Sequence, residues 1–550
     1  MLNQIIDSTN GLARQYALEN TVELTNLIPP TVSYESGGHT LIIGPTAIVE
    51  STAQQLSTLN SVTLLSTDGA SSDSRQLYFA EAVSVSGFLG AFSVNVTQDG
   101  VQHNLAKIAI NSDCFDIVLD LCLDSCMSEE IPAPGYYPVG RGQPKLADAL
   151  QAIPNLMGTF DKPKFFRLDS DLCAHSSRGV KGCDRCVSSC PAGALSSEGS
   201  DDTGYQIAIN PYLCQGIGTC ATACPTEAIS YALPEPKQTQ TFVEKLLNNY
   251  RSKGGTHPIV MFCSSRHEKY NAALLSQLPD NVIPVALEEL TSVGIDTWLA
   301  ALVNGANQIW FAASRHMPET ILRVLNGEVE MLRTLLGQLN INANIIEIIY
   351  FEELKHTQPK VQCFDNSMTY GELQGNKRQR AFAALEHLTT VFEAPTRVVA
   401  LPEGAPYGSV SCASQDCTLC MSCVAVCPTS ALHSDGESPS LMFTEQDCIQ
   451  CGMCEKACPE NALSTTSRFN WNHEERSTPK TLHQEEAAKC IRCHKPFAPK
   501  SMITMLQNKL RGHSHFSDQA AFSRLEMCED CRVVDMFEAF DQDPTKQLKV

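Results

Sequence analysis

The sequence predicts α/β domains with parallel sheets, combined with two small cysteine-rich modules and a small C-terminal metal-knuckle domain. Strand-like apolar runs alternate with helical stretches ahead of each cysteine-rich region, which is typical of parallel sheets. The motif Cys-Pro-x-x-Ala-(Leu/Ile) occurs four times, and two Cys-x2-Cys pairs lie near the C-terminus. We expect an N-terminal α/β domain over 1–145, a first cysteine module over 160–235, a second α/β domain over 241–355, a connecting helix over 371–395, a second cysteine module over 400–467 and a C-terminal metal domain over 485–550.

Composition narrows the class of protein. The chain has 550 residues, more than a single hydrophobic core accommodates, and its formal charge of −21 argues against nucleic acid or an anionic membrane surface as a partner. Its 25 cysteines cluster at metal-ligand spacings and do not resemble a disulfide framework. The N-terminus lacks a basic region followed by an apolar stretch, and no apolar run approaches the roughly 18 residues of a membrane span. We therefore expect a cytoplasmic protein without direct membrane insertion.

The first α/β domain is expected to contain four strands before a Pro/Gly-rich passage at 131–140, which predicts an ordered linker. The expected strands are Thr40–Ile43, Ser61–Leu65, Lys107–Ile110 and Phe115–Leu121.

The second α/β domain alternates strands and helices, which favours a parallel sheet with right-handed crossovers. The expected strands are Ile259–Phe262, Val282–Leu287, Gln308–Ala313 and Ile345–Tyr350. The expected helices are Lys269–Leu278, Asp296–Asn304 and Pro318–Leu339, with a connecting helix near Asn376–Phe392.

The downstream module holds two complete cysteine runs, Cys417-x2-Cys420-x2-Cys423-x3-Cys427-Pro and Cys448-x2-Cys451-x2-Cys454-x3-Cys458-Pro. This spacing lets short turns present thiolates to the irons of a [4Fe–4S] cluster, while the last cysteine of each run reaches the other cluster. Over Ser411–Thr465 the module resembles bacterial two-cluster ferredoxins. One cluster is then expected on Cys417, Cys420, Cys423 and Cys458, and the other on Cys448, Cys451, Cys454 and Cys427.

The upstream module begins with a modified run, Cys173-x9-Cys183-x2-Cys186-x3-Cys190-Pro. The insertion contains Ser176, Ser177, Gly179 and Gly182, which predict a loop. Four thiolates are still available, so we expect a third [4Fe–4S] cluster on Cys173, Cys183, Cys186 and Cys224.

The second upstream run, Cys214-Gln-Gly-Ile217-Gly-Thr-Cys220-x3-Cys224-Pro, has Ile217 where the second ligand belongs. An isoleucine cannot bind iron, which leaves Cys190, Cys214 and Cys220. Three thiolates in this arrangement resemble the [3Fe–4S] sites of some ferredoxins. The alternatives are a [4Fe–4S] cluster with water or an exogenous ligand on its fourth iron, or no second cluster.

Two cysteine pairs near the C-terminus, Cys490-x2-Cys493 and Cys528-x2-Cys531, predict one tetrahedral metal site. Zinc is favoured and a single iron is the alternative; with four thiolates the site would be structural. Cys490-Ile-Arg-Cys493-His494 also fits a c-type haem attachment sequence, but haem attachment would not require the second pair.

The remaining cysteines that we consider fit buried or spare thiols better than ligands: Cys412 lies outside the ferredoxin pattern, and Cys114, Cys122 and Cys126 lack a fourth cysteine nearby. Residues 257–352 resemble the delta subunit of methyl-viologen-reducing hydrogenase at Phe262-Cys263, at Gly294-Ile-Asp296 and from Asn304 to Ala313. That family's cluster needs several cysteines and only Cys263 is present, so the resemblance implies a docking scaffold without a cluster.

Together these patterns predict an electron-transfer protein without catalytic residues. The domain order resembles that of iron–sulfur proteins that accompany formate dehydrogenases and hydrogenases, which implies a partner of that kind. Two other classes stay open: a self-contained reductase that binds substrate at an open iron, and a redox sensor or cluster-maturation factor.

Overall fold

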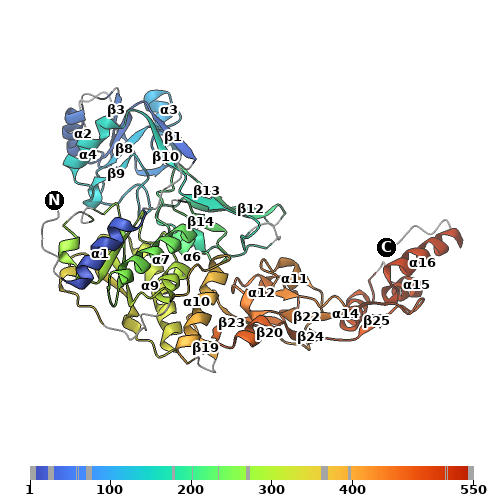
Figure 1. The fold of residues 1–550 in the computed structure, drawn as a ribbon. Coiled ribbons are helices and arrows are strands. Elements are labelled where there is room, and N and C mark those ends of the chain that lie inside the picture. The colour runs from blue at the N-terminus through green and yellow to red at the C-terminus, as the bar shows by residue number, and fades with distance from the viewer. Residues whose placement is uncertain are drawn as a thin grey trace.

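The computed structural model describes residues 8–542 except 23–29, 57–58, 60, 70–76, 176–179, 201, 233, 268–269, 271–272, 361–368, 394–397, 514–515 and 517. Figure 1 shows an N-terminal sheet domain, a helix-rich centre and a narrow C-terminal arm. The predicted loop residues Ser176, Ser177 and Gly179 lie outside the described residues.

The N-terminal domain is built on a five-stranded parallel sheet of order β4-β3-β2-β8-β9. Two helices pack their apolar residues on one face, while a three-stranded antiparallel sheet and a short helix cover the other. The parallel strands are β2 (His39–Gly44), β3 (Ser61–Ser66), β4 (Leu77–Phe79), β8 (Ile117–Asp120) and β9 (Tyr136–Pro138); the covering elements are α2 (Thr46–Ala53), α4 (Leu146–Ala152), β5 (Ala82–Ser86), β6 (Ser93–Gln98), β7 (Val101–Asn104) and α3 (Leu105–Ile110).

One predicted strand in this domain is wrong. Lys107–Ile110 belongs to helix α3, which begins after Asn104. The Asn104 side chain accepts the N–H of Lys107 at 3.1 Å and so caps the helix. An apolar run this short does not distinguish a strand from a buried helix, and the cap decides the outcome.

The central domain contains a parallel sheet of order β16-β15-β17-β18, as the alternating pattern predicts. Five helices share one hydrophobic core with this sheet. The first of them comes from the N-terminus of the chain and packs on α7, across the first predicted domain boundary. The strands are β15 (Ile259–Ser264), β16 (Val282–Leu287), β17 (Gln308–Ala313) and β18 (Ile346–Tyr350); the helices are α1 (Thr9–Asn20), α7 (Pro236–Ser252), α8 (Ile295–Val303), α9 (Glu319–Gly337) and α10 (Lys377–Val391).

The helix predicted at Lys269–Leu278 is wrong: its described part forms only a 3-10 turn at Leu275–Gln277. Leu274 and Leu278 are buried against the face of the sheet opposite the helices. Pro279 disfavours helical backbone at Leu278, which is extended, so the turn ends there.

The two cysteine modules repeat one arrangement, with two short helices packed together and two short antiparallel strand pairs. The first module contains α5 (Arg185–Ser188), α6 (Thr219–Ala223), β11 (Phe166–Leu168), β12 (Leu195–Ser200), β13 (Gly204–Ile209) and β14 (Ile229–Tyr231). The second contains α11 (Ser422–Val426), α12 (Met453–Lys456), β20 (Gly408–Cys412), β21 (Leu432–His433), β22 (Ser440–Phe443) and β23 (Leu463–Asn470).

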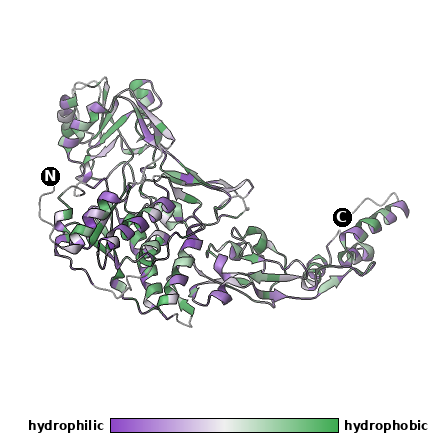
Figure 2. Cartoon of the chain, in the orientation of Figure 1, coloured by the Kyte–Doolittle hydropathy of each residue, from purple (hydrophilic) through white to green (hydrophobic). Residues whose placement is uncertain are grey.

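Beyond the second module, the chain continues into the C-terminal arm through β24, which pairs with β22. Figure 2 shows hydrophilic and hydrophobic residues mixed along the arm's helices. The arm contains β24 (Lys480–Gln484), β25 (Ala487–Lys489), β26 (Pro496–Pro499), α14 (Lys500–Leu510), α15 (Gln519–Ser523) and α16 (Glu529–Gln542). Within the described part of the chain, no helix combines the length and the apolar character that a membrane crossing requires.

The first module docks on the central domain through α6. Thr222 Oγ1 donates to the carbonyl of Thr291 at 2.7 Å, and Thr291 Oγ1 donates to the carbonyl of Ile217 at 2.7 Å. Gly218 lies between these contacts with a φ of +99°, and an added Cβ would lie 2.4 Å from the Thr291 carbonyl oxygen. Backbone approaches backbone here, so only glycine fits.

We expect Gly218→Ala to destabilise this docking. Gly404→Ala is a matched control, because Gly404 also has a positive φ (+83°) but nothing within 4 Å of its added Cβ. The left-handed conformation alone costs about 1–2 kcal/mol, and the collision should cost about 1–3 kcal/mol more at Gly218. Urea unfolding of the two variants checks this, and equal midpoints would contradict it.

Candidate metal centres

The cysteine loops share a backbone pattern that aims N–H groups at sulfur. The residues two and four positions after the first cysteine have positive φ in three loops, as Leu419 and Met421, Gln450 and Gly452, and Gly216 and Gly218. The backbone N–H two residues on donates to the sulfur of Cys417, Cys448 and Cys214 in turn. Such N–H donors stabilise thiolates.

The Cys-Pro exits also repeat. The third residue after the cysteine is left-handed at all four exits, namely Gly193, Glu227, Ser430 and Asn461. At two exits the following alanine donates its N–H to the cysteine sulfur, Ala194 to Cys190 at 3.4 Å and Ala462 to Cys458 at 3.3 Å. The repeated motif is therefore a repeated loop conformation.

The structure gathers the fifteen predicted cluster cysteines into four groups. Three groups line cavities of similar size: Cys417, Cys420, Cys423 and Cys458 about 350 Å³, Cys427, Cys448, Cys451 and Cys454 about 340 Å³, and Cys190, Cys214 and Cys220 about 350 Å³. The fourth group is Cys173, Cys183, Cys186 and Cys224, whose thiols interact electrostatically. These are the sets that the spacing predicts; their role as ligands stays a prediction.

The thiols are crowded, and each cysteine is buried or half-buried. Burial, followed by the neighbouring thiols, raises the pKa of Cys186 and of Cys423 to about 12. Burial likewise raises the pKa of Cys451 to about 11. Several thiolates in one such cavity need positive charge to compensate them, and iron supplies it. The donor sets therefore fit iron–sulfur clusters, with four thiols at three sites and three at the fourth.

Ile217 occupies the position of a ligand. It lies between left-handed Gly216 and Gly218, as Cys420 lies between Leu419 and Met421. Ile217 also lines the cavity of Cys190, Cys214 and Cys220. The register inferred from the sequence is thus matched by the backbone, and the fourth position at this site is apolar.

Two residues near the cysteine groups make contacts that the sequence did not predict. Cys412, which we expected to be a spare thiol, lies at the end of β20, and a hydrogen bond from its thiol lowers the pKa of Cys417 to about 6. His175 is fully buried; its Nδ1 lies 2.8 Å from the carbonyl oxygen of Cys183 and its Nε2 lies 2.7 Å from Ser197 Oγ. His175 therefore anchors the insertion that follows Cys173.

The sulfur atoms of Cys490, Cys493, Cys528 and Cys531 all lie within 4.8 Å of one another. This convergence favours a four-thiolate metal site over haem attachment, which uses only the first pair. Few apolar side chains surround the site: Met527 is buried with Cys490 and Cys528, and Phe497 packs against them.

Asp120, Cys122 and Cys126 also place ligand atoms within 4.8 Å of one another. The fully buried Asp120 carboxylate accepts the N–H of Cys122 at 2.9 Å, the N–H of Cys126 at 2.8 Å and the hydroxyl of Tyr136. These bonds already organise the loop after β8, so packed thiols remain the simpler interpretation. Cys114 is half-buried, and Cys263 is buried in the central sheet.

Comparison with known families agrees with the geometry. Residues 181–228 and residues 416–463 each match a family described as a 4Fe-4S dicluster domain. The chain therefore contains two 4Fe-4S dicluster domains. The first match begins after Cys173 and spans Ile217, so it includes the isoleucine at the ligand position but not the first predicted ligand. No curated protein matches the chain.

We expect metal at Cys490, Cys493, Cys528 and Cys531 to hold the C-terminal domain together, because the apolar cluster around these cysteines is small. A zinc chelator, or Cys493→Ser at this exposed cysteine, should speed tryptic cleavage beyond residue 485 about tenfold or more. Cys114→Ser is the control and should leave the rate unchanged. Cleavage that is insensitive to both treatments would contradict a structural metal here.

Proposed function

We propose that this chain is an iron–sulfur electron-transfer protein that carries electrons between a catalytic oxidoreductase and another carrier. The observation that supports this most directly is the order of the four cysteine groups, each of which lies next to the following one. Bound iron–sulfur clusters would supply one-electron oxidation and reduction.

Neighbouring cysteine groups lie next to each other within each module and between the two modules. In the first module, Cys220 of the three-thiol group interacts electrostatically with Cys186 of the four-thiol group. In the second, Cys454 interacts in the same way with Cys423. Between the modules, Cys451 interacts with Cys183. We name each group after its lowest-numbered cysteine. The groups form one series, from the Cys190 group through the Cys173 and Cys427 groups to the Cys417 group.

The modules touch where the series crosses between them. A Cβ added at Gly182 would lie 2.8 Å from the sulfur of Met453, so these residues are in close contact. The ammonium group of Lys456 donates a hydrogen bond to the carbonyl oxygen of Lys181 at 3.2 Å. Gly182 precedes the predicted ligand Cys183, and Met453 precedes the predicted ligand Cys454. Contact between Gly182 and Met453 therefore brings the cysteine groups of the two modules close together.

The same geometry weighs against a self-contained reductase. The three-thiol site is where an open iron could bind substrate, but Ile217 fills the position with an apolar side chain. Phe166, Leu195 and Ile209 complete the apolar lining there. We infer a three-iron cluster at this site, which would commonly have a higher potential than its neighbours, and zinc or a single iron at the C-terminal cysteines.

Our proposal for the partner enzyme rests on the resemblance of the central domain to a known family. The central domain's likeness to the delta subunit of methyl-viologen-reducing hydrogenase supports a docking role, since Cys263 is buried and has no cysteine partners for a cluster among the described residues. We propose a formate dehydrogenase- or hydrogenase-like partner in a reducing compartment such as the cytoplasm.

Anaerobic purification with iron and sulfide quantified, followed by stepwise reduction with dithionite, tests the function. We expect roughly fifteen cluster irons per chain and clusters that cycle intact between dithionite and an artificial acceptor. A sensor or maturation factor would instead release its clusters or pass them to an apoprotein. A colourless chain without acid-labile sulfide would overturn the proposal.

We expect Ile217→Cys to supply the missing ligand. Iron content should rise by about one per chain, and the paramagnetic signal of an oxidised three-iron cluster should disappear. Ile209→Cys is the matched control, since Ile209 lines the same cavity away from the ligand position. An unchanged signal in Ile217→Cys, or its loss in both variants, would contradict the assignment.

A further inference from the structure

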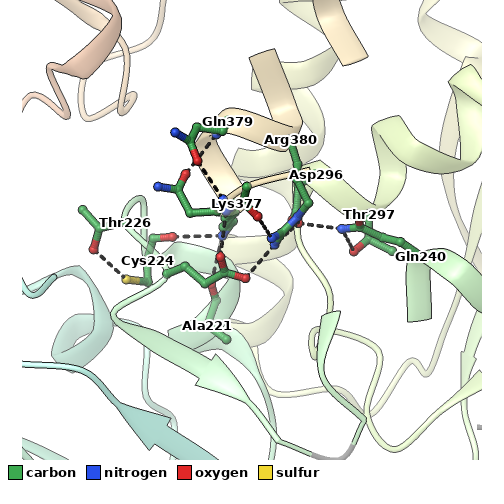
Figure 3. A network of polar contacts seen from close by, with 12 residues as sticks. Ala221, Cys224, Thr226, Gln240, Asp296, Thr297, Lys377, Gln379 and Arg380 are labelled. Atoms are coloured by element: carbon green, nitrogen blue, oxygen red, sulfur yellow. Dashed lines mark hydrogen bonds and ion pairs between the residues drawn. The ribbon is translucent and has the colours of Figure 1, made fainter. Parts of the chain in front are cut away.

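Two consecutive cations at the start of α10 bind backbone carbonyls in different cysteine modules. Figure 3 shows Lys377 directed at the first module, where its Nζ lies 2.9 Å from the carbonyl oxygen of Ala221, 2.6 Å from that of Thr222 and 3.0 Å from that of Cys224. These carbonyls end α6, where a helix leaves acceptors without partners in the helix. Lys377 is only 8% exposed, so its charge lies inside the protein beside a predicted cluster ligand.

Arg378 binds backbone carbonyls of the second module. Its guanidinium donates to the carbonyls of Cys448, Gln446 and Pro406, each at 2.7 Å. It also lies over the rings of Phe382 and Tyr407 at 4.9 and 4.8 Å. Arg378 is half-buried and lines a cleft of about 880 Å³ that residues of both modules border.

Neither of these two charges has a carboxylate at ion-pair distance among the described residues. At longer range, Glu328 interacts electrostatically with Lys377, and Asp447 with Arg378. Arg380, on the same helix, is neutralised: it pairs with Asp296 at 2.8 Å and with Glu227 at 2.6 Å. Figure 3 shows this network, in which Gln240 also donates to Asp296 at 2.7 Å.

A charge inside a protein that lacks a direct ion pair acts strongly on its neighbours, because little water screens it. A cation favours whichever state of a nearby group carries more negative charge. Reduction adds one negative charge to an iron–sulfur site, and the charges around such a site help to set its potential. Lys377 adjoins the Cys173 group through Cys224, and Arg378 adjoins the Cys427 group through Cys448.

These two groups are the ones that meet between the modules. We propose that Lys377 and Arg378 are positioning residues that raise the reduction potentials of the two facing sites together, so that the first turn of α10 keeps them matched for electron crossing. This inference rests on the proposed function. Because the two cations are consecutive residues of one helix, any movement of α10 would act on both sites at once.

The test is a redox titration of the anaerobic full-length chain, followed by electron paramagnetic resonance. Lys377→Gln and Arg378→Gln remove the charges while the amide can still donate to a carbonyl. We expect each variant to shift a different one-electron step downwards, and the double variant to shift both. Lys377→Gln should weaken reduction about tenfold, which is about 59 mV for one electron, and the half-buried Arg378→Gln should have a smaller effect.

Lys456→Gln is the matched control, since Lys456 also donates to a module carbonyl but is exposed to water, and its shift should be smaller than either. If Lys377→Gln binds less iron than the wild type, Lys377→Arg is measured in its place, because arginine keeps the positive charge. Reduction potentials equal to those of the wild type would then support the inference. Shifted reduction potentials in Lys377→Arg would overturn it. Unmoved steps in fully loaded Gln variants also overturn the inference, while leaving the proposed function intact, because the clusters would still be present and reducible.

Discussion

The constraint on which the structure depends is the gathering of three or four thiols into close groups that are buried or half-buried. Ionised sulfurs repel one another, and burial raises the pKa of thiols such as Cys186 and Cys423. The chain offsets this with its backbone: left-handed residues in three of the loops turn N–H groups toward sulfur, and positive metal is expected to compensate the remaining charge. The domains around the modules supply what such small units lack, namely a large core and fixed docking surfaces.

The two modules share the loop conformations of three of their four cysteine runs but differ in their predicted ligand sets. The downstream module keeps every expected cysteine, whereas the upstream module has Ile217 at one ligand position and an insertion anchored by the buried His175. In the proposed function, unlike clusters in one series would give it a direction, because sites of unequal potential favour electron movement one way. The departure at Ile217 lies at the far end of the series from the C-terminal arm, so the two ends are chemically distinct.

Sequence reasoning succeeded where a recurring motif or a hydrophobic run determines the structure. Cysteine spacing predicted all four groups, and Val282–Leu287 and Gln308–Ala313 are the strands that hydrophobic runs indicated. It failed where distant contacts or a cap decide, as at Lys107–Ile110 with its Asn104 cap. No local pattern could place α1 on the core of the central domain or Lys377 against the carbonyl of Cys224, since the partners are far apart in the sequence.

The central claim is that four redox sites form one continuous series across two modules. Pulsed electron paramagnetic resonance on the fully reduced chain tests this most directly, through spin–spin coupling between sites. The account predicts coupling within each module and between the Cys173 and Cys427 groups, with the coupling between modules lost when Cys451→Ser disrupts the second partner. Two modules whose signals are magnetically independent of each other would contradict it.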